Sequence, residues 1–206
     1  MAQILKKEIR EKILTTTRQA LLEKDFSSIN LREIAKESGV SLSNIYNYFP
    51  SKDALLEGVL EDTLREFDQA SQEIERTLLS KKKLLYLNFD KSQTYAKTIM
   101  GFILKHRENL NILAHKSKGS KLDEYINNWA KNYARLEYTS LKLKAKGHKD
   151  ILKNLPSEFF MENICGFFFS SAKKLVKKDL NEKELKKYLE EIFAFIYQGW
   201  EYYTEF

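Results

Sequence analysis

The sequence contains few of the residues that sheets, long loops and disulfide scaffolds require. Its 206 residues include seven glycines, two prolines and a single cysteine. Because each chain reversal in a sheet or a long loop needs turn-forming residues, this shortage favours long helices joined by short connections. The cysteine, Cys165, cannot form a disulfide within the chain, so a disulfide scaffold is excluded and a reducing compartment is expected.

Long apolar runs are missing as well. No stretch approaches the ~18 uncharged apolar residues that a transmembrane helix needs, and residues 1–10 carry charges where a signal peptide has an apolar core. Charged residues make up 31% of the chain and hydrophobic residues 43%, which is typical of a soluble globular protein and not of a disordered one. We therefore expect a cytoplasmic protein that has no membrane partner.

The residue types that carry catalysis give little support to an enzyme. His106, His115 and His148 are too far apart in the sequence for metal-ligand spacing. Cys165 has no basic neighbour that would favour its thiolate, and no glycine-rich loop is present to hold a phosphate. The sequence predicts no catalytic residue, no metal and no cofactor, so a helical enzyme is the weakest interpretation.

The charge balance is basic, with 35 lysines and arginines against 29 acidic residues and a net charge of +6. Such a balance permits a polyanion partner such as nucleic acid, but solvated lysine-rich helical faces produce it too. We interpret the lysine-rich run at residues 142–149 as a solvated face. A preference for an acidic effector is the alternative for that run.

Apolar residues recur at helical spacing along almost the whole chain, which predicts an all-α fold. The expected helices span residues 4–24, 31–39, 42–48, 52–79, 82–106, 109–116, 120–146, 157–178 and 182–203. Asn30, Ser41 and Ser51 are the predicted N-caps of the second, third and fourth helices, since their side chains can accept from free backbone N–H groups. Gly39 is expected to end the second helix, where a left-handed residue is favoured.

The second and third of these helices are short, are joined by a glycine turn and lie between two long helices, which matches a helix-turn-helix unit. Its expected apolar core is Ile34, Ala35, Val40, Ile45 and Phe49. The other face of residues 42–48 is polar and carries two tyrosines. Such a face suits a DNA major groove, where side chains must meet base edges and phosphate oxygens.

These residues resemble the TetR family of bacterial transcriptional regulators. The family pattern has a capped helix containing Ile-Ala, a Gly-Val-Ser turn, Leu-Tyr-x-x-Phe and a following lysine. The matching residues here are Asn30, Ile34-Ala35, Gly39-Val40-Ser41, Ile45-Tyr46-Asn47-Tyr48-Phe49 and Ser51-Lys52. The resemblance covers residues 13–57, about a fifth of the chain, and it is specific because many positions agree in register.

The resemblance implies an N-terminal three-helix helix-turn-helix DNA-binding domain at residues 1–51. It implies a C-terminal helical domain at residues 52–206 that binds an effector and dimerises. It also implies which residues contact a double-stranded DNA operator. Arg32 would contact a base or a phosphate, Leu42, Ser43, Asn44 and Asn47 would face bases, and Tyr46, Tyr48 and Lys52 would contact phosphates.

Three residues depart from the family pattern. Many members have glycine at the position of Asp25, but aspartate also tolerates a left-handed turn. Many have lysine at the position of Leu42, so this chain lacks one phosphate contact there. A histidine is common where Asn47 stands, and this difference changes the preferred DNA sequence rather than the class of activity.

An effector pocket is expected on the middle helices, where members of the family line a cavity. The candidate lining residues are Phe89, Tyr95, Met100, Phe102, His106, Trp129 and Tyr133. Aromatic residues at helical spacing are also typical of an ordinary core, which is the alternative interpretation for each of them.

The last two helices are the predicted dimer elements, because their apolar stripes are too rich for one narrow contact. The stripes comprise Phe159, Phe160, Ile164, Phe167 and Phe168 on one helix, and Leu185, Leu189, Ile192, Phe193, Ile196 and Trp200 on the other. Two such hairpins from two subunits would form a four-helix bundle. The alternative is that these side chains form the core of a single chain.

The sequence therefore predicts a homodimeric DNA-binding transcriptional regulator, a repressor that a small-molecule effector releases from its operator. The alternative is a DNA-binding protein of the same fold that responds to a protein partner and binds no small molecule. A cavity on the order of several hundred cubic ångströms in the C-terminal part would favour the first interpretation, and a closed core would favour the second.

Overall fold

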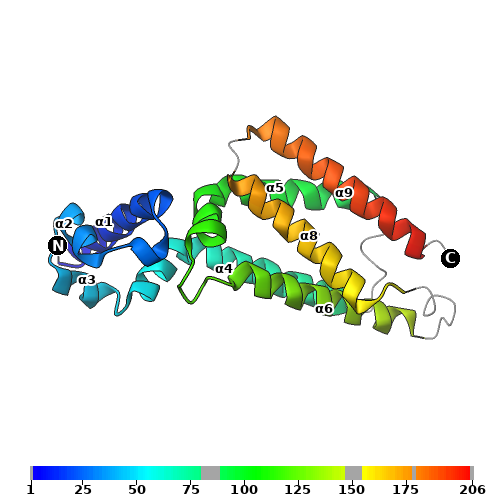
Figure 1. Ribbon diagram of the computed structural model, residues 1–206, viewed down its shortest axis with the longest axis horizontal. Helices are drawn as coiled ribbons and strands as arrows, with labels where there is room; N and C mark the ends of the chain where they lie inside the picture. The colour runs from blue at the N-terminus through cyan, green and yellow to red at the C-terminus, as the bar shows by residue number, and fades with distance from the viewer. Residues whose placement is uncertain (1, 80–88, 147–154, 178–179, 205–206) are drawn as a thin grey trace. The chain divides into compact units, whose positions relative to one another are not determined.

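The computed structural model describes residues 2–79, 89–146, 155–177 and 180–204, and every regular element within these ranges is helical (Figure 1). In chain order the elements are α1 (Ala2–Glu23), the 3-10 turn η1 (Phe26–Ser28), α2 (Leu31–Ser38), α3 (Leu42–Tyr48), α4 (Lys52–Leu79), α5 (Phe89–Asn111), the π-helical turn η3 (Ile112–Lys116), α6 (Tyr125–Ala145), α8 (Glu158–Lys177) and α9 (Glu182–Thr204). The predicted all-α fold class is confirmed.

The predicted helix caps are present. Asn30 Oδ1 accepts from the backbone N–H of Arg32 at 2.9 Å, and Ser41 Oγ accepts from that of Asn44 at 3.1 Å. Ser51 Oγ accepts from the backbone N–H of the third residue of α4 at 3.0 Å. Gly39 ends α2 with φ +65°, a left-handed conformation that costs glycine nothing because it has no Cβ.

Two predicted helix boundaries were wrong. The helix expected from residue 120 begins at Tyr125, because the Ser120 hydroxyl accepts from the nearby N–H of Leu122 at 3.1 Å and forms a local turn instead of a cap. The break expected between residues 106 and 109 is a kink inside α5, where His106 has the non-helical angles φ −113° and ψ 17°. The expected start at residue 82 lies outside the described residues.

The chain divides into two compact units. Unit 1 comprises Met1–Phe67 and Glu108–Tyr125, and unit 2 comprises Asp68–Arg107 and Ile126–Phe206. The segment from the last turn of α5 to the start of α6 therefore packs with the helix-turn-helix. The division into a DNA-binding domain at residues 1–51 and an effector domain at residues 52–206 concerns function, and it stays a prediction.

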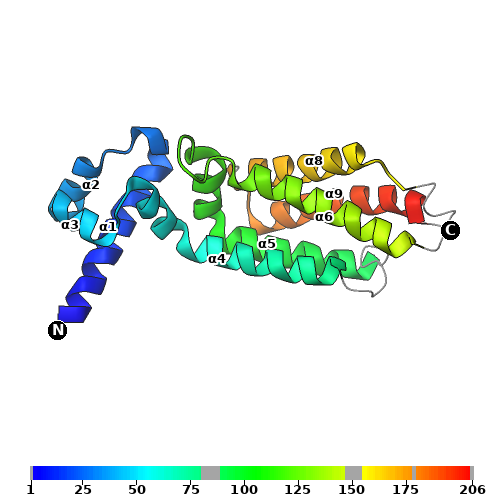
Figure 2. The ribbon, with the colours of Figure 1, turned by 90° about the horizontal axis from the view of Figure 1, so that it is seen from below.

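Unit 1 has its own apolar core. The largest fully buried side chains come from α1 to α4 and from η3, and they are Ile13, Leu21, Ile34, Ile45, Leu55, Leu56, Leu60, Ile112 and Leu113. Helices α1, α2 and α3 lie next to one another in both ribbon views (Figures 1 and 2). The short helices α2 and α3 thus owe their stability to burial against longer neighbours, because helices of this length are marginal alone.

Unit 2 is built from the remaining long helices. Leu141 of α6 and Met161 of α8 form a buried pair, and Ile196 of α9 packs against them. The Ser140 hydroxyl of α6 donates to the carbonyl oxygen of Leu78 in α4 at 2.6 Å. Among the residues that the structure describes, none of the helices combines the length and apolar character needed to cross a membrane.

Candidate nucleic-acid interface and effector groove

One face of α3 presents three exposed polar side chains. Ser43, Tyr46 and Asn47 are exposed, and their spacing of three and four residues places them on the same side of the helix. Tyr46 keeps 50% of its surface accessible, whereas Ile45 on the opposite side is fully buried. A capped, anchored helix with such a face can present hydroxyl and amide groups to base edges and phosphates.

The other predicted DNA contacts on α3 are less exposed to solvent. Leu42, Asn44 and Tyr48 are half-buried on α3, and Arg32 is exposed near the start of α2. The structure therefore brings Arg32 and the α3 residues into one unit, and it exposes Ser43, Tyr46 and Asn47 more than the other α3 residues. The assignment of each residue to a base or a phosphate stays a prediction.

Lys52, the predicted phosphate contact at the start of α4, has partners within the chain. Its Nζ donates to the carbonyl oxygen of Ser27 at 3.3 Å and lies 4.5 Å from the centre of the Phe26 ring. Burial lowers the pKa of Lys52, while the neighbouring Asp53 carboxylate acts in the opposite direction. In the structure, Lys52 therefore ties the turn before α2 to the start of α4, and its contact with a phosphate stays a prediction.

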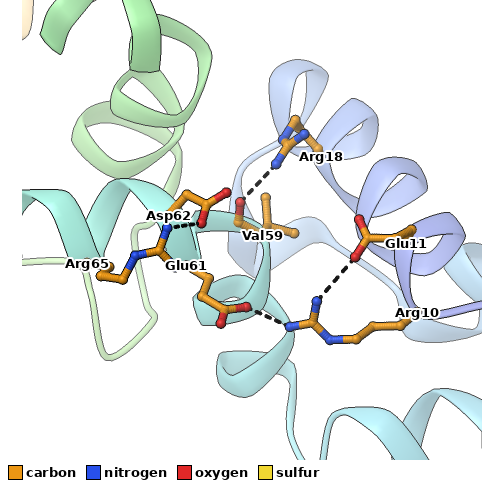
Figure 3. Close-up of polar contacts among 7 residues, drawn as sticks. All are labelled: Arg10, Glu11, Arg18, Val59, Glu61, Asp62 and Arg65. Carbon is orange, nitrogen blue, oxygen red and sulfur yellow. Dashed lines mark hydrogen bonds and ion pairs between the residues drawn. The ribbon is translucent and has the colours of Figure 1, made fainter. Parts of the chain in front are cut away.

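Helix α1 is fastened to the first part of α4 by two arginines (Figure 3). Arg10 Nη2 lies 2.7 Å from Glu61 Oε2, and Arg18 Nη2 donates to the carbonyl oxygen of Val59 at 3.1 Å. The Arg10 guanidinium also lies 5.6 Å from the centre of the Phe49 ring, at the residue that ends α3. These contacts link α1, the end of α3 and the first turns of α4.

The packing of α4 in unit 1 is closest at Gly58. A Cβ atom at this position would lie 2.8 Å from Phe49 Cε1 and 3.1 Å from Leu14 Cδ2. Real Cβ contacts are not that short, so the phenylalanine that closes α3 sits directly on the bare backbone of α4. Helical periodicity could not predict this contact, because only the tertiary structure brings Leu14 and Phe49 onto Gly58.

A groove of about 400 Å³ lies in unit 2 with walls from α4 and α6. Its lining residues are Ser71, Ile74, Glu75, Trp129, Asn132, Tyr133, Arg135, Leu136 and Thr139. Two of the predicted effector residues, Trp129 and Tyr133, are therefore in one groove.

The aromatic part of the groove is held from several sides. The Trp129 and Tyr133 rings are stacked, with centroids 5.3 Å apart and an interplanar angle of 14°. The Phe169 ring meets Trp129 edge-on at 4.8 Å, and the indole N–H of Trp129 donates to Ser71 Oγ. Two charged side chains, Glu75 on α4 and Arg135 on α6, are exposed in the lining. The groove thus combines fixed rings with charges of both signs.

Of the predicted effector residues on α5, those whose side chains the structure describes, Met100, Phe102 and His106, are not in this lining. Met100 and Phe102 are half-buried, and the His106 ring is buried with its centre 4.8 Å from that of Phe102. The side chains of Phe89 and Tyr95 lie outside the described residues. For all five, a role in effector binding stays a prediction.

Sequence reasoning missed most of the groove. Asn132 and Leu136 follow Trp129 and Tyr133 by three residues each, so helical periodicity of α6 could have found them. The α4 wall, with Ser71, Ile74 and Glu75, could not be found in that way, because only the tertiary structure brings it against α6.

The predicted dimer stripes separate into exposed and buried residues. Phe159, Phe167 and Phe195 keep 75%, 49% and 67% of their surface accessible, and the Phe167 and Phe195 rings lie 6.5 Å apart. Phe195 was not among the predicted stripe residues. Large apolar side chains exposed together in this way are uncommon on a monomer and mark contact surfaces.

Other members of the stripes pack within the chain. Leu185, Leu189 and Ile192 are buried, and Ile196 packs on the Leu141–Met161 pair. Phe160 is exposed, and Ile164, Phe168 and Phe193 are half-buried, with the Phe168 and Phe193 rings 5.6 Å apart. The side chain of Trp200 lies outside the described residues. The core interpretation therefore holds for the buried residues of the stripes, and the dimer interface stays a prediction for the exposed ones.

Two short helices joined by a glycine turn, capped and fastened between α1 and α4, define a helix-turn-helix protein. Residues 13–59 match the family described as "Bacterial regulatory proteins, tetR family". The resemblance to the TetR family seen in the sequence is therefore confirmed over these residues.

Individual relatives agree with this result. Over 60 residues the chain is 38% identical to the HTH-type transcriptional regulator EthR of Mycolicibacterium smegmatis, an alignment that covers 29% of this chain and 28% of EthR. The chain thus matches less than a third of the length of this curated relative.

Solved structures extend the similarity to most of the chain. A putative TetR-family transcriptional regulator from Syntrophomonas wolfei is similar over 93% of this chain and 96% of its own, with a TM-score of 0.60 and 21% identity. The transcriptional regulator FadR from Bacillus subtilis, solved in complex with stearoyl-CoA, is similar over 89% and 96%, with a TM-score of 0.55 and 14% identity. At these identities the likeness shows the shared fold.

Proposed function

We propose that this chain is a homodimeric, sequence-specific DNA-binding transcriptional regulator, a repressor that a small-molecule effector releases from its operator. The observation that carries the proposal is the exposed polar face of α3, formed by Ser43, Tyr46 and Asn47. The match of residues 13–59 to the tetR family supports it. In this proposal residues 1–51 contact DNA, residues 52–206 bind the effector and the second subunit, and the protein acts in the cytoplasm.

The second subunit would cover the exposed phenylalanines of α8 and α9. Phe159, Phe167 and Phe195 are accessible, and the Phe167–Phe195 contact joins the exposed faces of the two helices. A twofold axis brings the same patch of two copies together, so a self-complementary apolar face favours a homodimer. Burial of these rings would be worth roughly 25 cal/mol for each Å² of apolar surface removed from water.

The effector would occupy the groove that contains Trp129 and Tyr133. Its volume of about 400 Å³ is in the range of small-molecule sites. The ring faces and edges suit an apolar or aromatic group, and Glu75 and Arg135 can bind polar groups of either charge. FadR from Bacillus subtilis, whose fold is similar, was solved with stearoyl-CoA, which supports ligand binding in a helical domain of this kind.

Control of DNA binding would follow from the distance between the two α3 helices of a dimer. Two recognition helices dock together only when they are about one helical turn of DNA apart, ~34–36 Å. An effector that binds more tightly to a dimer with another separation shifts the population toward that state and weakens operator binding.

The test of DNA recognition compares Asn47→Ala with Asn163→Ala, the same change at an exposed position of α8. We expect Asn47→Ala to lose ~1–3 kcal/mol of discrimination between the operator and a sequence altered at one base pair. Asn163→Ala should bind both duplexes as the unmodified protein does. Equal discrimination by all three proteins in a fluorescence anisotropy titration would show that Asn47 does not contact a base.

The effector proposal has a separate test. The chain has two tryptophans, so Trp200→Phe leaves Trp129 as the sole indole fluorophore. In a screen of small metabolites, a true effector should change Trp129 emission and release operator DNA at the same concentrations, and Arg135→Gln should weaken both effects for an anionic compound. A compound that releases DNA with Trp129 emission unchanged would place the effector site elsewhere.

A further inference from the structure

A short segment from outside the helix-turn-helix contacts both of its flanks. We call residues 116–121, from the last residue of η3 into the turn before α6, the bracket. Lys116 Nζ lies 3.4 Å from Asp25 Oδ1, in the turn that leads into α2. The backbone N–H of Lys121 donates to Asp53 Oδ1 at 2.8 Å, in the first turn of α4. The bracket thus connects the turn before α2 with the first turn of α4.

The bracket is a preformed turn. Ser117 Oγ donates to the carbonyl oxygen of Leu113 at 2.7 Å. The backbone N–H of Ser120 donates to the carbonyl oxygen of Ser117 at 3.0 Å. The backbone N–H of Gly119 donates to Asp123 Oδ2 at 2.9 Å. These bonds tie the bracket to itself and to the residues just before and after it, so they hold Lys116 and the Lys121 N–H in place relative to each other.

Both ends of the bracket are anchored in unit 1. Before it, Leu113 is buried and Asn109 Nδ2 donates to Oγ1 of the fully buried Thr63 at 2.9 Å. After it, the Tyr125 ring meets the Phe67 ring of α4 edge-on at 5.7 Å. The bracket therefore rests on α4 at one side and supports the flanks of the helix-turn-helix at the other.

We propose that the bracket positions the DNA-reading helices, so that Lys116, Lys121, Asp25 and Asp53 are positioning residues for operator binding. This inference rests on the proposed function, because it assumes that α3 binds DNA. Lys116 acts through its ion pair with Asp25, and Lys121 acts through its backbone N–H. In this proposal neither lysine binds a DNA phosphate, although both are basic and belong to unit 1, which contains the helix-turn-helix.

The two roles differ in their salt dependence. A lysine that binds a phosphate releases a counterion, so its removal weakens binding and lowers the slope of log affinity against log salt by about one. A positioning contact holds α3 in place without touching DNA, so its removal weakens binding and leaves the slope unchanged.

The first test compares Lys121→Pro with Lys121→Ala. Proline removes the N–H that Asp53 accepts, and alanine keeps it while removing the charged side chain. We expect Lys121→Pro to weaken operator binding about tenfold, which is typical for the loss of one charge-assisted hydrogen bond, with the salt slope unchanged. Lys121→Ala should stay within about twofold of the unmodified protein. A lowered slope for Lys121→Ala, or equal affinity of the two variants, would overturn the proposal.

Asp53→Ala and Asp53→Asn repeat the test from the other side of the bond, in case proline disturbs folding of the turn. Both variants lose the negative charge at the start of α4, so their effects on the helix dipole are matched. Asparagine keeps a side-chain oxygen for the Lys121 N–H. We expect Asp53→Asn to bind operator more tightly than Asp53→Ala. If both variants unfold cooperatively and bind operator equally, the proposed role of the bracket is contradicted.

The ion pair is tested by exchange of its charges. Asp25→Lys and Lys116→Asp should each weaken operator binding by roughly two- to fivefold, since partly exposed ion pairs are weak. The double variant should recover that loss at an unchanged salt slope. If Lys116 binds a phosphate instead, the double variant stays weak and its slope falls. An unmodified protein that selects no DNA sequence would refute the proposed function, and with it the assumption on which the bracket rests.

Discussion

Among the glycines that the structure describes, Gly58 of α4 leaves the least room for a Cβ atom. Alanine is favoured over glycine inside a helix by ~1 kcal/mol, but a Cβ at this position would collide with Phe49 and Leu14. We expect Gly58→Ala to destabilise the protein by ~1–3 kcal/mol, as overpacked cores do. Since Phe49 ends α3, operator affinity should fall as well.

Gly101→Ala is the matched control, because a Cβ there meets none of the described residues within 4 Å and the residue also lies inside a helix. It should raise the free energy of unfolding or leave it unchanged. Urea unfolding of the two variants measures the difference, and equal stability would show that α4 and Phe49 are not in close contact.

Cys165 should be unreactive in the folded protein. It is buried, and its thiol donates to Glu137 Oε2 at 3.7 Å. Burial raises the pKa of Cys165, and the charge and hydrogen bond of Glu137 raise it further. We therefore expect a thiol reagent at pH 8 to modify the unfolded chain at least ~100-fold faster than the folded one. Comparable rates would mean that the thiol is accessible.

The raised pKa of Cys165 also predicts that the free energy of unfolding depends on pH. The folded thiol keeps its proton where the unfolded thiol, with an ordinary pKa of about 8.5, begins to lose it. This contribution to stability is complete below about pH 8.5 and is lost progressively as the pH rises above it. Cys165→Ser, whose hydroxyl does not ionise in this range, should show a weaker decline of unfolding free energy between pH 8 and 10.

Predictions for single residues were confirmed where the interaction joins residues that are close in the sequence. The caps Asn30, Ser41 and Ser51 follow from the hydrogen-bonding range of a side chain within three residues. The partners of Lys52 and Arg10 are a turn and a helix that lie far away in the sequence. Nothing in the local pattern could distinguish these lysine and arginine side chains from solvated ones.

At the scale of helices, the exposed face of α8 and α9 makes a specific prediction. Phe195→Glu places a charge on the accessible surface, which the free chain tolerates and a packed interface does not. We expect a folded monomer by sedimentation, with operator binding weakened because one recognition helix has lost the avidity of two.

Ile196→Glu is the comparison, since Ile196 packs on Leu141 and Met161 inside its own chain. It should lower the stability of the fold by several kcal/mol. A Phe195→Glu protein that remains a dimer would place the interface on another surface.

Helix bounds could be predicted well where polar caps mark the ends. The predicted spans of α3 and α4, residues 42–48 and 52–79, agree with the structure. The start of α6 was wrong by five residues, because Ser120 bonds locally within the bracket. The α6 wall of the groove could be predicted from periodicity, but its α4 wall depends on how the two helices pack, which periodicity does not determine.

At the scale of the whole molecule, the account requires two copies of α3 that bind DNA at once. The sequence predicted the family, the recognition helix and the two helices of the proposed dimer. The structure adds which of their phenylalanines are exposed, and the pairing of two chains through them stays a proposal. A dimer with twofold symmetry binds an inverted repeat. The sequence of each half-site therefore depends on the recognition helix, and the repetition of the half-site depends on the dimer.

The most direct measurement is selection of bound duplexes from random DNA, with the unmodified protein and Asn47→Ala in parallel. The account predicts an inverted repeat whose half-sites are centred about 10 base pairs or a multiple apart. Asn47→Ala should relax the preference at one or two base pairs, at the same position in both half-sites. A single unrepeated site, no enriched sequence, or the same sequence preference for both proteins would contradict a dimer that recognises its operator through α3.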